Sequence, residues 1–129
     1  MNELSPEDQS LVEEAQAIIR KRFKEGAHHI GSALRTKSGN VFVGVHVEGT
    51  IGRVAVCAEA IAIGHAATAG DTDIDTIVAV TEEGRVVPAC GICRELISDY
   101  SPEANIIIEK DKELQAAPVS ELLPQKYRR

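Results

Sequence analysis

The chain has 129 residues, which is the size of one domain spanning 1–129, with enough apolar residues to form a core without disulfide support. Its net charge of −6 argues against a nucleic-acid groove as the main binding surface. The apolar runs are too short to cross a bilayer, and the acidic, polar start does not match a secretory signal. We therefore expect a soluble cytoplasmic protein with no membrane partner.

The first third of the chain predicts an amphipathic helix followed by a β-hairpin. Ser5 and Pro6 are typical of an N-cap and of the first helical position, and Gly26 is typical of a helix end. Between them, apolar residues recur at helical spacing and form one face. Alternating residues over 28–34 and the apolar run 41–47, separated by Ser-Gly-Asn, predict the two strands of a hairpin.

The remaining chain alternates between helices and strands. The alanine-rich stretch 56–69 predicts a buried helix, and the β-branched run 74–81 predicts a central strand. We expect a second short helix over 90–100, followed by strands at 106–108 and 114–119. This order predicts an α/β fold: a three-layer α/β/α sandwich built on a mixed five-stranded sheet.

The cysteines are the residues that point most directly to chemistry. Cys57 opens one expected helix, while Cys90 and Cys93 form a C-x-x-C pair that opens another. Helix N-termini favour thiolates, and three thiolates around Zn²⁺ leave one coordination position open, as in catalytic zinc sites. Glu59 follows Cys57 by two residues, which would set a carboxylate beside the metal to carry protons. The pattern predicts one Zn²⁺ per chain.

Two other interpretations of the cysteines are open. They could be buried free thiols that behave as small hydrophobic side chains, or a thioredoxin-like redox pair. A C-x-x-C pair at a helix start, with a third cysteine before Ala-Glu, argues against simple burial. The Gly-Ile between the paired cysteines and the absence of tryptophan argue against the redox pair.

Taken together, the motifs resemble the cytidine deaminase superfamily. The segments that carry the resemblance are 31–34 (GSAL), 44–48 (GVHVE), 57–59 (CAE), 90–95 (CGICRE) and 121–124 (ELLP). Within the superfamily the chain looks like the small homotetrameric zinc class, which includes cytidine deaminase and blasticidin-S deaminase. The resemblance implies hydrolytic deamination of a cytosine-type nucleoside to its uracil form with release of ammonia.

The resemblance also implies roles for single residues. The three cysteines match the zinc ligands, and Glu59 matches the proton shuttle, which would also donate to the ring nitrogen. The N–H of Ala58 matches a donor to the base carbonyl, and Arg94 matches an arginine that donates to the cysteine sulfurs. Glu48 matches an acceptor for a sugar hydroxyl. Tyr127 matches an aromatic residue that stacks on the base in a neighbouring subunit, which implies a homotetramer with shared active sites.

The sequence departs from cytidine deaminases at positions outside the zinc–glutamate motif. His28 and His46 replace Phe and Asn, and strand alternation allows either ring to face the pocket. Ala60 replaces the arginine that usually follows the shuttle glutamate, and Gly52 replaces a loop tyrosine. Pro88 is one residue further from the C-x-x-C pair than usual. Because of these departures, the sequence does not identify the sugar of the substrate, or the group that takes its place.

Three functions are therefore hypotheses. The first is zinc-dependent deamination of cytidine, deoxycytidine or an analogue, with His28, His46 and Glu48 selecting the sugar unit. The second is a blasticidin-S-type deaminase that detoxifies a substituted cytosine nucleoside, favoured by the stretch 64–70. The third is a non-catalytic zinc-binding scaffold, against which the presence of Glu59 argues. In the first two, the partner is a small-molecule nucleoside.

Overall fold

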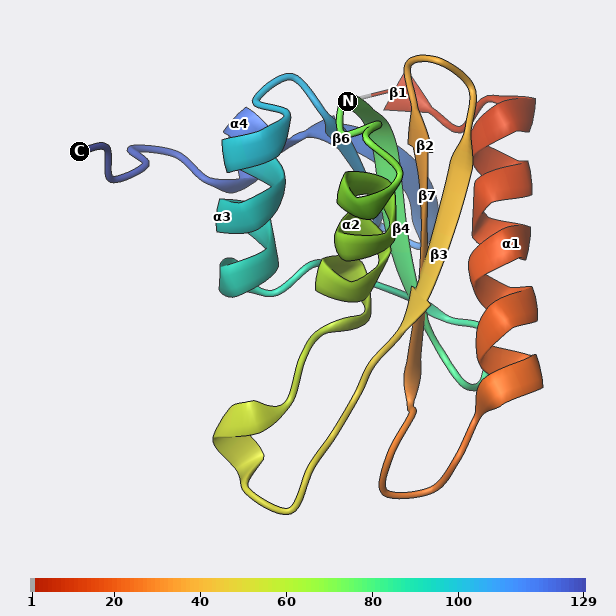
Figure 1. Ribbon diagram of the computed structural model, residues 1–129. Helices are drawn as coiled ribbons and strands as arrows, with labels where there is room; N and C mark the ends of the chain where they lie inside the picture. Colours follow the sequence, from red (N-terminus) through yellow and green to blue (C-terminus); the bar gives the residue numbers. More distant parts are fainter. Residues whose placement is uncertain (1) are drawn as a thin grey trace.

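A mixed β-sheet forms the centre of the computed structural model, which describes residues 2–129 (Figure 1). Five longer strands form most of the sheet: β2 (Ile30–Thr36), β3 (Val41–Val45), β4 (Ile74–Thr81), β6 (Asn105–Lys110) and β7 (Glu113–Pro118). Their order across the sheet is β7-β6-β4-β2-β3. The β4–β6 pair is parallel and the other pairs are antiparallel, so the predicted mixed sheet is confirmed.

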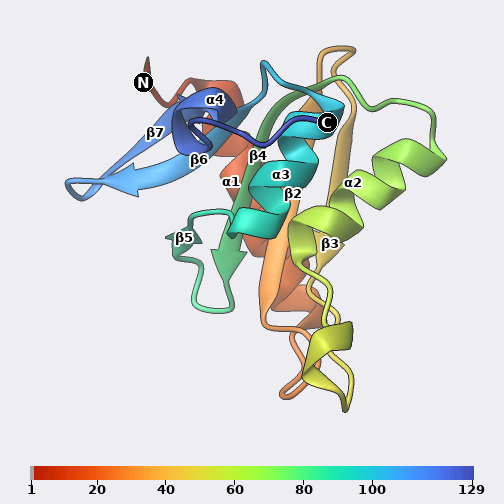
Figure 2. The same cartoon turned by 90° about the vertical axis from the view of Figure 1, so that its left-hand side faces the viewer.

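Helices cover both faces of this sheet. α1 (Pro6–Arg22) lies on one face, and α2 (Ala58–Thr68) and α3 (Gly91–Tyr100) lie on the other (Figures 1 and 2). Two shorter helical segments, η1 (Gly52–Val54) and α4 (Val119–Leu122), precede α2 and follow β7. Within residues 2–129, no helix has both the length and the apolar character of a membrane span. The predicted α/β sandwich with helices on both faces is confirmed.

Strand alternation explains how the two faces are filled. Ala33 of β2 and Val78 of β4 pack with α1. Their neighbours along the same strands, Leu34 and Ile77, pack with α2 and α3 on the other face. Both faces of the central strands are therefore buried, as the β-branched run 74–81 indicated.

The sheet has two strands that the sequence did not predict. β1 (Asn2–Glu3) pairs with β7, and β5 (Val86–Val87) pairs with β4, so the sheet has seven strands within the described residues. The predicted number of five was too low. Each of the additional strands is only two residues long, too short to show an alternating pattern in the sequence.

Two glycines in the hairpin allow the helices to approach the sheet closely. A Cβ atom on Gly31 would lie 2.6 Å from the carbonyl oxygen of Ala15 in α1. A Cβ atom on Gly44 would lie 2.6 Å from the amide nitrogen of Ala62 and 2.7 Å from the carbonyl oxygen of Ala58, both in α2. The backbone of α2 thus rests directly on β3, and this contact sets the position of the first turn of α2.

The connection from β3 to α2 projects beyond the sheet. It includes η1 and is closed at its base by the Val47–Val56 bridge (Figures 1 and 2). Two of its apolar side chains, Ile51 and Val54, are 64% and 54% exposed. The segment ends at Cys57, so one end of this projecting loop is fixed at the cysteine cluster.

Substituting Gly44 with alanine tests the close approach of α2 to β3. Because the new methyl group would meet helix backbone, we expect Gly44→Ala to lower the free energy of unfolding by about 1–3 kcal/mol. Gly64→Ala is the matched control in α2, since a Cβ atom there meets nothing within 4 Å. We expect that variant to be more stable by up to about 1 kcal/mol. Urea unfolding measures both, and an unchanged midpoint for Gly44→Ala would contradict the contact.

Candidate metal centre and active site

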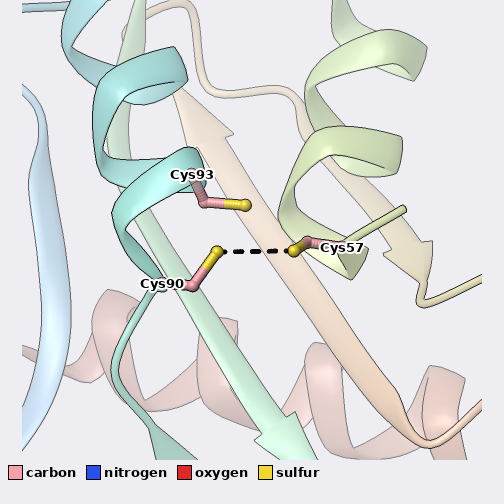
Figure 3. A group of neighbouring side chains, drawn as sticks. All are labelled: Cys57, Cys90 and Cys93. Carbon is pink, nitrogen blue, oxygen red and sulfur yellow. Dashed lines mark hydrogen bonds between the residues drawn. The ribbon is translucent and has the colours of Figure 1, made fainter. Parts of the chain in front are cut away.

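Three sulfur atoms meet between the N-termini of α2 and α3 (Figure 3). Cys57 is the N-cap of α2, Cys90 is the N-cap of α3, and Cys93 lies in the first turn of α3. The three Sγ atoms lie within 4.8 Å of one another, and those of Cys57 and Cys90 are 3.4 Å apart. All three cysteines are free of disulfides. The cluster predicted from the sequence is therefore present as a geometric unit.

The size of the cluster suits a tetrahedral metal ion. Zn–S bonds of about 2.3 Å at tetrahedral angles separate two sulfur ligands by about 3.8 Å. The 3.4 Å separation of the Cys57 and Cys90 sulfurs and the 4.8 Å upper limit for all three pairs are compatible with that value. Neither N-cap cysteine uses its side chain to cap its helix, so both sulfur atoms remain available as ligands. Within residues 2–129, no histidine or carboxylate joins this group of three.

The electrostatics of the cluster also suit a bound cation. Burial raises the pKa of the Cys57 and Cys93 thiols. Burial also opposes ionisation of Cys90, but hydrogen bonds from the Cys93 backbone N–H and from the Cys57 thiol outweigh it and lower the pKa of Cys90. Three thiolates at this site therefore require a compensating positive charge. The N-terminal ends of two helices supply part of it, and a divalent cation would supply the rest.

Glu59 stands beside the cysteines in a small cavity. It is the second residue of α2 and only 5% exposed, and burial raises the pKa of its carboxyl group. The cavity has a volume of about 170 Å³ and is lined by Cys57, Cys90, Ala58, Glu59 and His46 together with apolar residues of β2, β4 and the segment before α3. Burial thus favours the protonated form of this carboxyl group more than in an exposed glutamate.

Ala58 and His46 are the two predicted binding residues that line the cysteine cavity. Ala58 is the first residue of α2, so its N–H has no partner within the helix and is free to meet a ligand. The His46 side chain is 15% exposed, and its Nε2 lies 4.0 Å from Oε1 of Glu48. Glu48 does not line this cavity, but it lies next to His46, which does.

His28 lies elsewhere. It lines a second cavity of about 350 Å³ at the edge of β3, together with His65 and Ile61 of α2. His46 thus lines the cavity with the cysteines, whereas His28 lines a different one. The reason is that β2 begins only at Ile30, so strand alternation does not extend back to residue 28.

The Arg94 side chain, for which the resemblance implied donation to the cysteine sulfurs, donates to backbone carbonyl oxygens in this structure. Its Nε donates to the carbonyl oxygen of Ala89 at 2.8 Å, and its Nη1 donates to that of Leu122 at 3.0 Å. Because Ala89 directly precedes Cys90, Arg94 instead fixes the backbone that leads into α3 and ties it to α4. The acceptors are backbone groups that sequence patterns do not specify.

Tyr127 is 79% exposed and lies in the tail after α4, outside the cysteine cavity of its own chain. The tail is held by Lys126, whose Nζ contacts Oδ1 of Asp99 in α3 at 2.5 Å. Tyr127 borders a surface hollow with Glu95 and Asp99, on the part of α3 that follows its first turn.

His29 is a residue that the sequence analysis did not select. Its backbone N–H donates to Nδ1 of His46 at 3.1 Å, and its ring lies 5.9 Å from that of His46. The only signal for it in the sequence was the pair of adjacent histidines before the hairpin.

Comparisons with known proteins agree with this geometry. The sequence model described as "Cytidine and deoxycytidylate deaminase zinc-binding region" matches residues 5–109. A blasticidin-S deaminase from Bacillus cereus is 47% identical over 134 aligned residues, covering 98% of this chain and 96% of that protein. A cytidine deaminase from Halalkalibacterium halodurans is 33% identical over 119 residues, covering 84% of this chain and 90% of that protein.

Solved structures give the same result for the fold. The crystal structure of cytidine deaminase from Mycobacterium leprae superposes with a TM-score of 0.78 at 27% identity, covering 91% of this chain and 97% of that chain. The resemblance stated from the motifs is thereby confirmed. From its sequence, its fold and its cluster of three cysteines, the chain belongs to the cytidine and deoxycytidylate deaminase family of zinc-binding proteins.

Proposed function

We propose that this protein is a zinc-dependent deaminase that hydrolyses the exocyclic C–N bond of a cytosine-type nucleoside. The observation that carries the proposal is the buried Glu59 in one cavity with Cys57 and Cys90. A carboxyl group beside a three-thiolate site combines a proton carrier with a place for a metal ion. Relatives named cytidine deaminase and blasticidin-S deaminase support the same reaction class.

Cys57, Cys90 and Cys93 would hold Zn²⁺ with one position left open. When bound, the ion would act as a Lewis acid and lower the pKa of a water molecule to give a nucleophile near neutral pH. The apolar part of the cavity wall would exclude other water and strengthen every electrostatic contact inside.

Glu59 would move the protons of the reaction. Its carboxylate would accept a proton from the attacking water, and its protonated form would donate to the ring nitrogen and then to the departing amine. The new C4–O bond and the broken C4–N bond would leave a uracil base and ammonia, with the water supplying both oxygen and protons. The N–H of Ala58 would hold the base carbonyl, while His46 and Glu48 would contact the sugar unit or its substitute.

A second candidate is a blasticidin-S-type deaminase, which acts on a substituted cytosine nucleoside. The 47% identity to a protein of that name favours it, as does a histidine rather than an asparagine at position 46 in the cavity wall. Both candidates use the same zinc site and the same proton carrier. They differ only in the group attached to the base, so comparing turnover of cytidine, deoxycytidine and blasticidin S separates them.

We further propose a cytoplasmic homotetramer in which neighbouring chains share active sites. Exposed apolar side chains on the loop before α2, Ile51 and Val54, support a contact with another chain. Tyr127 lies outside the cysteine cavity of its own chain and is free to reach that of a neighbour. The unpaired thiols suit a reducing compartment.

Replacing one cysteine tests the metal site. We expect Cys90→Ala to contain well below one zinc per chain, because removing a ligand leaves two thiolates to hold the ion. Metal analysis of the purified protein measures this directly. Glu59→Gln is the control, since that side chain is not one of the proposed ligands, and it should retain a full equivalent. Full zinc in Cys90→Ala would contradict the ligand set.

Replacing Glu59 tests the chemistry. We expect Glu59→Gln to lower kcat/KM by about 10²–10⁴-fold, the usual contribution of a positioned general acid–base. The ultraviolet change on deamination, with ammonia release as a second readout, follows the reaction. Wild-type turnover in this variant would refute the proton-carrier role. If the zinc-loaded wild type deaminated no cytosine compound at all, the scaffold hypothesis would be favoured over both enzymes.

Replacing Tyr127 tests the shared site. We expect Tyr127→Ala to raise KM by about tenfold or more, because stacking on a base is worth about 1–3 kcal/mol. Tyr100→Ala is the control, since Tyr100 is the only other tyrosine and is exposed at the end of α3. Light scattering should give the mass of four chains. A fully active protein with the mass of one chain would rule out sharing.

A further inference from the structure

Three consecutive residues, 28–30, form hydrogen bonds with His46. The backbone N–H of His46 donates to the carbonyl oxygen of Ile30 at 2.9 Å. Its carbonyl oxygen accepts from Nδ1 of His28 at 2.8 Å, and its ring Nδ1 accepts from the backbone N–H of His29 at 3.1 Å. The backbone of His46 and one ring nitrogen are thus fixed by the segment 28–30, leaving only Nε2 for other partners.

These contacts determine where the hydrogen of the His46 ring sits. A backbone N–H can only donate, so Nδ1 of His46 must present its lone pair. In the neutral imidazole the hydrogen is then on Nε2. His46 lines the cavity that contains Cys57 and Glu59, and its Nε2, which lies 4.0 Å from Oε1 of Glu48, can act toward a ligand there only as a hydrogen-bond donor. An asparagine amide, by contrast, offers both a donor and an acceptor.

The same reasoning assigns the donor in the contact of His28. A carbonyl oxygen can only accept, so His28 Nδ1 carries a hydrogen and donates it to His46. His28 lines the second cavity, at the edge of β3, and not the one that contains the cysteines. Within one chain, His28 is therefore linked to the cysteine site through its hydrogen bond to His46.

We propose that His28 is a positioning residue. Together with the backbone N–H of His29, it holds His46 as the Nε2–H tautomer facing the cavity. The substrate group that meets His46 must then be a hydrogen-bond acceptor. What this inference says about the substrate rests on the proposed function. The hydrogen bonds that carry it belong to the chain itself, and they can be tested without turnover.

Nuclear magnetic resonance of ¹⁵N-histidine-labelled, zinc-loaded protein tests the tautomers. The chain has four histidines, and a neutral imidazole carries its hydrogen on one of its two ring nitrogens. We expect His46 alone to be the Nε2–H form, with its signals assigned by their loss in His46→Asn. His28 and His65 donate from Nδ1 to carbonyl oxygens, and His29 Nε2 accepts from the N–H of Gly26, so these three should be Nδ1–H forms. An Nδ1–H form of His46 would overturn the proposal.

Substitution of His28 tests the positioning role, and His65 provides a matched control. His65 lines the same second cavity and donates Nδ1–H to a carbonyl oxygen of the same strand region, that of Val43, at 2.7 Å. Val43 does not line the cysteine cavity. Removing either histidine therefore removes one similar hydrogen bond, but only His28 is bonded to a residue of the site.

We expect His28→Phe to raise KM by about tenfold, the effect of losing one hydrogen bond, with little change in kcat. In the His28→Phe protein, the NMR signals of His46 should show a mixture of both tautomers. His28→Asn should restore KM and tautomer, since its amide N–H can replace the donor. His65→Phe should leave both KM and the His46 tautomer unchanged.

Equal effects of His28→Phe and His65→Phe would reduce His28 to a structural role and overturn the proposal. If the wild type deaminates nothing, the proposed function fails while the tautomers still report on the positioning.

Discussion

The N-termini of α2 and α3 point at the same place, and the rest of the site depends on this convergence. The positive ends of two helices would repel each other unless negative charge lay between them. Here each helix begins with a cysteine, and a third cysteine lies one turn into α3. Ionised cysteines would complement the helix ends, and a bound cation would offset the burial that opposes their ionisation. The same charges would then stabilise both the fold and the site.

This convergence is possible because α2 and α3 share one face of the sheet and are bordered by small residues. Ala62 and Ala66 of α2 are fully buried in the cluster that also contains Cys93 and Ile97 of α3. Gly44 lets the backbone of α2 rest on β3 without an intervening side chain. Close packing on two sides leaves little freedom for the first turn of α2. Glu59, carried by that turn, is accordingly buried beside the sulfurs instead of exposed.

Residues at the ends of β2 and β3 form another part of the cavity wall. His46 reaches the cavity, while its orientation is set by the segment that precedes β2. His28 and His46 thus act as one unit joined by a hydrogen bond, one at the site and the other in a separate cavity. Arg94 has an analogous place on the opposite side, where it fixes the backbone that leads to Cys90. The groups facing a substrate are few, and several others hold them in place.

Patterns that act locally were predictable from the sequence by itself. The N-cap Ser5, the five longer strands and the cysteines at two helix starts follow from capping, from period-two and period-3.6 hydrophobicity, and from ligand spacing. Contacts with distant backbone groups were decided only by the tertiary structure. The two-residue strands exist through pairing with β4 and β7, and His28 and Arg94 are oriented by the carbonyl oxygens of residues far along the chain. A carbonyl oxygen is present in every residue, so no sequence pattern marks which one a side chain will reach.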